Sequence, residues 1–108
     1  MGETHLGEFE QLVMLALVRL GENAYGVTVR AEIEKRAGRE VALGAIYKTL
    51  ARLEDKGLIS SAVGDPTPER GGRRKKFYRV AAAGIRALNQ SFAALRRMTR
   101  GLGKELEA

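Results

Sequence analysis

Basic residues on one loop, and polar residues on a helical segment before it, are the part of this sequence best suited to chemistry. The loop carries cationic side chains at Arg70, Arg73, Arg74, Lys75 and Lys76, and the helical segment carries Lys48, Thr49 and Arg52. Cationic side chains displace counterions from nucleic-acid phosphates, and ammonium and hydroxyl groups hydrogen-bond to base edges. A basic loop alone is as often a solvated surface. Together with the helical residues, the loop favours a contact with double-stranded DNA.

Other reactive residue types do not form a set that could catalyse a reaction. Glu8, Glu10 and Glu54 fall on separate helix faces, with no nucleophile or histidine at a matching spacing. The single histidine, His5, cannot hold a metal alone, and the absence of cysteine excludes disulfides and thiolate zinc sites. We therefore expect no enzymatic activity, no metal and no cofactor.

Length and charge bound the remaining possibilities. The 108 residues, of which 44% are hydrophobic and 30% charged, suit one globular domain spanning residues 1–108. The net charge is +6, and residues 41–80 carry nine bases against four acids, which fits a surface that faces a polyanion. The acidic start is unlike a secretory signal, and the longest apolar run, residues 12–18, is too short to cross a membrane. We expect a cytoplasmic protein with no membrane partner.

Apolar residues at steps of three and four predict three helices in the first half of the chain. They span residues 6–20, 24–37 and 43–56, and Gly21, Gly38 and Gly57 follow their ends. Glycine accepts the left-handed backbone that commonly ends a helix. Asn23 is a candidate cap for the second helix.

A hairpin and a long helix are predicted to follow. Residues 58–63 and 76–80 favour strands, and their connection contains both prolines and is too long for a tight turn. Residues 82–106 form a helix with apolar residues on a heptad seam, namely Ile85, Leu88, Phe92, Leu95, Leu102 and Leu106. A narrow seam on a helix that projects from a small core predicts a partner helix. Gly101 and Gly103 weaken this helix near its end.

This order of elements is that of a winged helix-turn-helix, a mainly α fold with a small β-hairpin, here followed by a C-terminal dimerisation helix. In this fold the third helix enters the major groove and the hairpin wing follows the DNA backbone. The face of the third helix opposite its apolar stripe is expected to present Gly44, Ala45, Lys48, Thr49 and Arg52. Tyr47 lies on the apolar stripe, where packing is the first interpretation, although its hydroxyl could reach a phosphate.

A family resemblance extends over nearly the whole chain. It is carried by Tyr25-Gly26, Ile46-Tyr47, Leu50, Arg52-Leu53-Glu54, Gly57-Leu58-Ile59, Lys75-Lys76-Phe77-Tyr78 and Gly84. In these residues the sequence resembles the PadR family of transcriptional regulators, in its short C-terminal type. The resemblance implies repression by a homodimer on an inverted-repeat operator, with the last helix packed on the partner's first and last helices. The dimer interface would be formed by Leu6, Phe9, Val13, Ile85, Leu88, Phe92, Leu95, Met98 and Leu102.

The sequence departs from the family pattern at two helix starts. Ala42-Leu43 replaces the Ser-Pro often found before the third helix, and Ala81 replaces a capping Thr, so both starts lose a side-chain cap. Small relatives that bind flat apolar compounds hold them between tryptophans, and this chain has none, so the sequence names no small-molecule inducer. A second interpretation stays open, in which the wing of a winged-helix interaction module docks an acidic protein rather than DNA.

Overall fold

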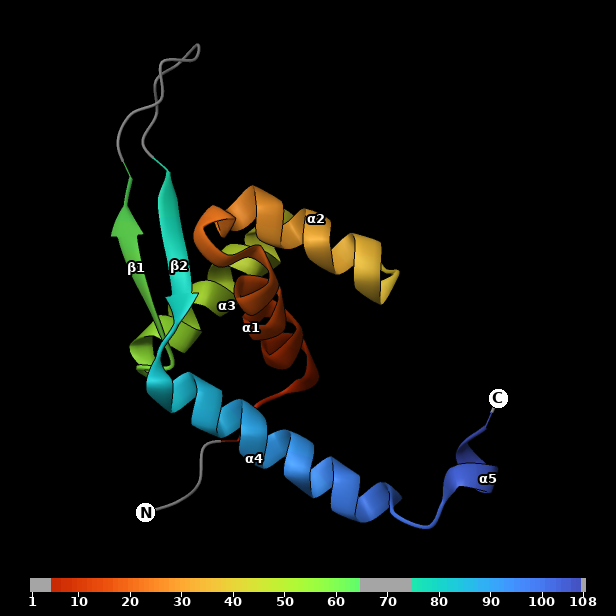
Figure 1. The fold of residues 1–108 in the computed structure, drawn as a ribbon. Helices are drawn as coiled ribbons and strands as arrows, with labels where there is room; N and C mark the ends of the chain where they lie inside the picture. Colours follow the sequence, from red (N-terminus) through yellow and green to blue (C-terminus); the bar gives the residue numbers. More distant parts are fainter. Residues whose placement is uncertain (1–4, 65–74, 108) are drawn as a thin grey trace.

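The computed structural model describes residues 5–64 and 75–107, and its elements follow the expected order. Helices α1 (Glu8–Leu20), α2 (Gly26–Ala37) and α3 (Leu43–Asp55) precede a hairpin of β1 (Ile59–Val63) and β2 (Lys76–Val80). A long helix α4 (Ala82–Thr99) and a single turn α5 (Gly103–Leu106) complete the chain. Figure 1 shows α1 beside the hairpin and below α2, with α4 extending away from them as an arm. The fold is the mainly α winged helix that the sequence predicts.

Helix α1 lies at the centre of the core and contacts α2, α3 and β2. The buried apolar side chains that meet there are Val13, Met14, Leu17, Val29, Ile33, Ile46, Leu50 and Leu53. Each large apolar side chain removed from water contributes roughly 1.5–3 kcal/mol to the free energy of unfolding. Helix α3 is therefore held firmly by one face, and its opposite face is left exposed.

Glycines end the first two helices, as predicted. Gly21 has φ 58° after α1 and Gly38 has φ 70° after α2, and the short 3-10 helix η1 (Gly21–Asn23) connects α1 to α2. The prediction that Asn23 caps α2 is wrong, because the helix begins at Gly26 with Tyr25 at its N-cap. The backbone N–H of Tyr25 donates to Oγ1 of Thr28 at 3.0 Å, so the cap comes from inside the helix.

The hairpin is antiparallel and is joined to the helices by backbone hydrogen bonds. Its register pairs Ile59 with Val80 and Val63 with Lys76. The N–H of Tyr78 donates to the carbonyl of Ala24 at 2.9 Å, which connects β2 to the segment between α1 and α2. Tyr78 and Ile59 are buried in the core. The base of the wing therefore has a fixed position relative to α3.

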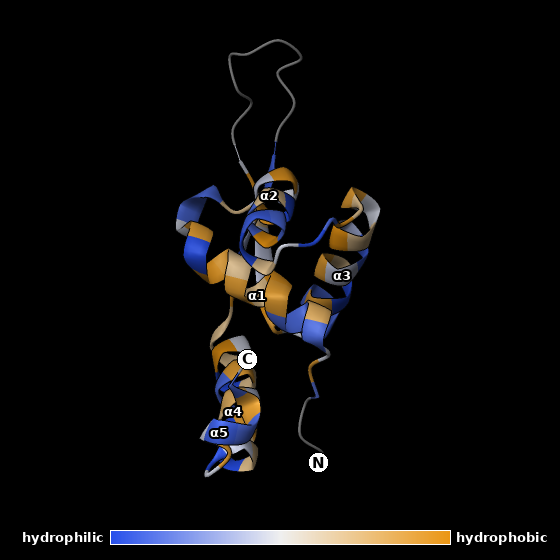
Figure 2. Ribbon diagram, turned by 90° about the vertical axis from the view of Figure 1, so that its right-hand side faces the viewer, coloured by the Kyte–Doolittle hydropathy of each residue, from blue (hydrophilic) through white to orange (hydrophobic). Residues whose placement is uncertain are grey.

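The C-terminal helix is shorter than predicted. A single helix over residues 82–106 is wrong, since α4 ends at Thr99 and α5 is a separate turn. Arg100 has an extended backbone and Gly101 has φ 82°, outside the helical region. Two glycines within three residues remove the propensity that would have continued the helix. Figure 2 shows apolar residues along α4 where it lies apart from the helical body, and residues 94–107 are all exposed.

Candidate nucleic-acid interface

The outer face of α3 presents the ammonium group of Lys48 after two small residues. Gly44, Ala45 and Lys48 are exposed, as expected, while Ile46, Leu50 and Leu53 on the opposite face are fully buried. Within the described part of the chain, no acidic side chain pairs with Lys48. Small residues at the helix start and an available ammonium group suit close approach to a polyanion.

Thr49 does not belong to this face. Its exposed fraction is 2%, so the expectation of an exposed Thr49 is wrong. The buried stripe of α3 is wider than the apolar residues indicate, because this helix packs against α1, α2 and β1. Thr49 lies three positions after Ile46 and next to Leu50, within that wider stripe.

Tyr47 lies at the edge of α3, not in the core. The residue is 46% exposed, so packing in the core does not describe it. A Cβ atom at Gly26 would lie 2.4 Å from the ring carbon Cζ and from the hydroxyl oxygen of Tyr47. Only glycine at the start of α2 allows this approach. The ring is thus set against α2 while part of it remains open to solvent.

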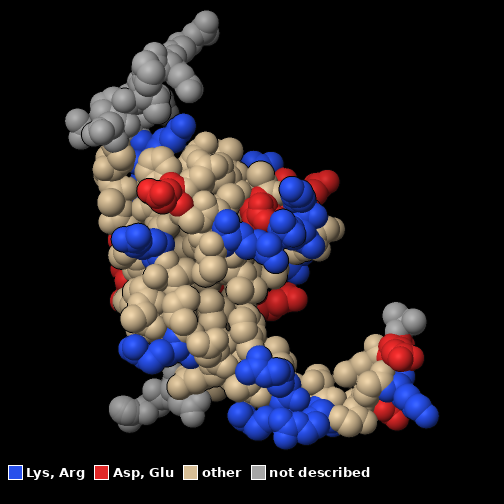
Figure 3. Space-filling model, viewed as in Figure 1, with Lys and Arg blue, Asp and Glu red and all other residues tan. Residues whose placement is uncertain are grey.

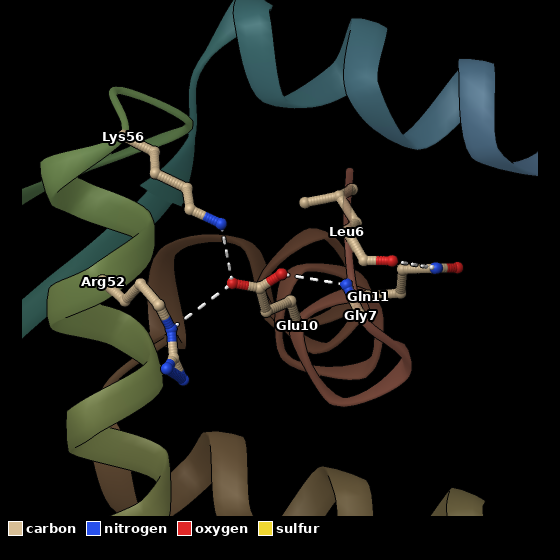
Figure 4. Close-up of polar contacts among 6 residues, drawn as sticks. All are labelled: Leu6, Gly7, Glu10, Gln11, Arg52 and Lys56. Carbon is tan, nitrogen blue, oxygen red and sulfur yellow. Dashed lines mark hydrogen bonds and ion pairs between the residues drawn. The ribbon is translucent and has the colours of Figure 1, made fainter. Parts of the chain in front are cut away.

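Arg52 is exposed on α3 as expected, and it is paired with the carboxylate of Glu10 on α1. Nε of Arg52 lies 3.5 Å from Oε2 of Glu10, and Nζ of Lys56 donates to the same oxygen at 3.1 Å (Figure 4). Oε1 of Glu10 accepts the N–H of Gly7 at 2.9 Å. Burial raises the pKa of Glu10, but the Gly7 hydrogen bond and the charges of Lys56 and Arg52 outweigh it and lower the pKa overall.

The base of the wing carries two lysines that face different neighbours. Nζ of Lys75 lies 4.7 Å from the ring centroid of Tyr25, and Nζ of Lys76 lies 3.7 Å from Oε1 of Glu54 on α3. Oε2 of Glu54 accepts the hydroxyl of Ser61 on β1 at 2.6 Å. Figure 3 shows basic side chains at the base of the hairpin loop and along α4. The expected Arg70, Arg73 and Arg74 lie outside the described residues.

The expected dimer residues fall into three groups. Val13 and Leu88 are buried within the core of this chain, so assigning them to a dimer interface is wrong because they have almost no surface to offer. Leu6, Phe9 and Phe92 are partly buried against that core. The remaining four are exposed: Ile85, Leu95, Met98 and Leu102. Leu102 lies beyond the end of α4, so it does not continue the helical seam.

Comparison with known proteins decides the family. Residues 14–90 match the PadR-like family of transcriptional regulators. The chain belongs to this family. It is also similar to a PadR family transcriptional regulator from Eggerthella lenta, at 31% identity and a TM-score of 0.67, over 94% of this chain and 88% of that chain.

Two further structures share the fold of this PadR-like regulator. A PadR family regulator from hypervirulent Clostridium difficile has a TM-score of 0.70 at 20% identity, over 92% of this chain and 99% of that one. A PadR-like transcription factor from Bacteroides fragilis has a TM-score of 0.69 at 23% identity, over 88% of this chain and 86% of that one. No curated protein matches the sequence. Among the described residues, no helix is both long and apolar enough to span a membrane.

Proposed function

We propose that this PadR-like regulator is a sequence-specific repressor that binds double-stranded DNA as a homodimer, in the cytoplasm, on an inverted-repeat operator. The observation that carries the proposal is the outer face of α3, where Lys48 stands exposed beside Gly44 and Ala45. Large apolar anchors, which a protein-docking face would need, are not among these residues. A helix with this face fits the major groove.

Each part of the interface then has a role. Lys48 contacts a base edge or a phosphate, and the small residues before it let the helix start approach the groove floor. Arg52, the exposed part of Tyr47 and the wing residues contact phosphates, the wing residues being Arg70, Arg73, Arg74, Lys75 and Lys76. Glu54 supports this arrangement, because it contacts both Ser61 and Lys76 and so holds the wing base beside α3.

The exposed apolar residues of the α4 arm support dimerisation. The exposed apolar residues Ile85, Leu95 and Met98 lie on α4, where this chain leaves them largely open to water. A second copy would cover them and would place two α3 helices about a two-fold axis. Such a dimer reads two half-sites about 34 Å apart, or a multiple of that distance, in inverted orientation.

A gel-shift experiment on the region upstream of the chain's own gene tests the proposal, with a random duplex of equal length as the control. We expect a shifted band on the upstream region at protein concentrations that leave the random duplex free. Footprinting of that complex should show two protected half-sites related by symmetry. Equal, weak binding to both duplexes would contradict sequence-specific repression and favour the docking of an acidic protein.

A further inference from the structure

Glu10 stands out among the acidic residues near the candidate interface. Its side chain is only 12% exposed, whereas the other acid in the first turn of α1, Glu8, is 79% exposed. Both carboxylate oxygens of Glu10 are in use: one accepts the N–H of Gly7, and the other faces Arg52 and Lys56 of α3. A carboxylate beside a surface for polyanions removes positive charge from it, so its presence needs an explanation.

The geometry of Arg52 gives that explanation. Glu10 approaches the guanidinium through Nε, at 3.5 Å, and Figure 4 shows the two terminal nitrogens turned away from the carboxylate. The Arg52 side chain is still 49% exposed, and Lys56 adds a second cation to the same oxygen. The three side chains together keep one net positive charge. Among the described residues, no carboxylate pairs with the two terminal nitrogens of Arg52, and the ion pair at Nε restrains the direction of the side chain.

We propose that Glu10 is a positioning residue for DNA binding, holding Arg52 by Nε so that its terminal nitrogens meet a backbone phosphate. This inference rests on the proposed function. An arginine offers a planar fork of donors that matches a phosphate, and a side chain that is ordered before binding loses less freedom in the complex. Lysine in place of Arg52 would keep the charge, but its single ammonium nitrogen could not pair with Glu10 while two other nitrogens donate to a phosphate.

A double-mutant cycle separates positioning from simple charge cancellation. Glu10→Gln keeps an oxygen for the N–H of Gly7 and removes the negative charge, and Arg52→Ala removes the guanidinium. Dissociation constants are measured by fluorescence anisotropy on the operator, with the fold of each variant checked by circular dichroism. Arg52→Ala should weaken binding about tenfold in the wild-type background, the size of one charge-assisted hydrogen bond, and clearly less in the Glu10→Gln background.

The direction in which Glu10→Gln alone changes operator affinity distinguishes the two explanations most sharply. Glu10→Gln adds one positive charge, yet it should weaken operator binding, because the orientation of Arg52 is lost. Glu8→Gln makes the same charge change in the same turn of α1 at an exposed position, so it serves as the matched control and should tighten binding slightly or leave it unchanged. Arg52→Lys, at an exposed position, should bind nearly as weakly as Arg52→Ala.

Several results would overturn the inference. Tighter binding by Glu10→Gln, with an equal effect of Arg52→Ala in both backgrounds, would mean that Glu10 only cancels charge. A lower melting temperature with unchanged affinity would mean that it only stabilises the fold. If Glu10→Gln does not fold, wild-type affinity in Arg52→Lys would still overturn the inference. Each of these leaves the proposed function intact, whereas a wild-type chain that binds no duplex overturns both.

Discussion

Close backbone approach at Gly84 sets the position of the arm. A Cβ atom at this residue would lie 2.2 Å from the carbonyl oxygen of Leu58 and 2.9 Å from Cε of Met14. The first turn of α4 therefore meets the end of the hairpin and the core without room for a side chain. Residue 84 lies within the helix, where any residue can adopt the backbone conformation. Glycine is therefore required here because there is no space for a side chain.

Gly84→Ala should lower the free energy of unfolding by about 1–3 kcal/mol, because the added methyl group forces backbone and core side chains apart. Urea denaturation followed by circular dichroism measures the change. Gly103→Ala is the matched control, since a Cβ there meets nothing within 4 Å. The control should leave stability unchanged or raise it by up to about 1 kcal/mol. Equal effects of the two substitutions would contradict the close approach.

The ion pairs of Glu10 predict how stability depends on pH. The folded-state pKa of Glu10 is lowered from its usual value of 4.5, so the unfolded chain takes up the proton first as the pH falls. The contribution of Glu10 is therefore fully present above pH 4.5 and is lost as the pH falls through the folded-state pKa. Glu10→Gln should destabilise the chain at neutral pH and much less at acidic pH. Urea denaturation at neutral and acidic pH measures the free energy of unfolding of both chains. An equal loss of that free energy at the two pH values would contradict the stabilising role of the Glu10 ion pairs.

Residues differ in how far their exposure and contacts could be predicted from the sequence. Gly44, Ala45 and Lys48 were predicted correctly as exposed, because helical periodicity alone decides which face opposes Ile46 and Leu50. Thr49 was not, because the width of the buried stripe depends on which elements pack against α3. The pairing of Glu10 with Lys56 joins residues 46 positions apart, a relation that no local spacing can indicate.

Helix α3 and the wing act as one unit because Glu54 joins them. Its carboxylate contacts Ser61 on β1 and Lys76 on β2, so both strands are connected to the same turn of the helix. Burial of Tyr78, with the nearby Glu54 and Tyr47, raises the pKa of its hydroxyl, so the tyrosine stays neutral between hairpin and helix. The wing base is therefore placed before any ligand binds.

Replacing Arg73, Arg74, Lys75 and Lys76 together by alanine should weaken binding to operator and random duplex alike. The plot of log affinity against log salt concentration should flatten by about 0.9 for each phosphate that the wing no longer neutralises. Anisotropy titrations at several salt concentrations measure this slope. The exposed Arg96 and Arg97 of α4, changed to alanine, provide a charge-loss control whose slope should stay near that of the wild type. An unchanged slope in the wing variant would show that the wing does not touch the backbone.

Element boundaries were predictable where one signal dominated. The hairpin strands and the starts of α3 and α4 were predicted to within one residue, even though Ala42 and Ala81 provide no side-chain cap. The end of α4 was not, because the heptad seam favoured continuation while Gly101 and Gly103 opposed it. The glycines decide where the helix ends, because among the described residues of one chain the last part of the apolar seam packs against no other element that would stabilise a longer helix.

The whole molecule is more extended than one domain of its length. Its radius of gyration is 15.9 Å, whereas a compact chain of this size would have roughly 13 Å. Helix α4 contributes to this extension, because its second half leaves the core with Leu95 and Met98 exposed. An arm that carries exposed apolar residues away from the core gains stability when a second arm covers it.

Light scattering should therefore report twice the chain mass at micromolar concentration. Leu95→Glu should reduce it to the mass of one chain, because a charge buried without a partner costs several kcal/mol. The substitution leaves the core intact, since Leu95 is exposed within a single chain. Gln90→Glu adds the same charge at an exposed position on the opposite side of α4 and should remain dimeric. A wild-type monomer, or a dimeric Leu95→Glu variant, would contradict the proposed interface.

The central claim is that the outer face of α3 reads sequence, and the specificity ratio of Lys48→Ala tests it most directly. This ratio compares affinity for the operator with affinity for a random duplex, measured by anisotropy at one salt concentration. If Lys48 contacts a base edge, the variant should lose about 1–3 kcal/mol on the operator and much less on the random duplex. Equal losses on both would make Lys48 a phosphate contact. No change on either duplex would contradict the docking of α3 in the groove.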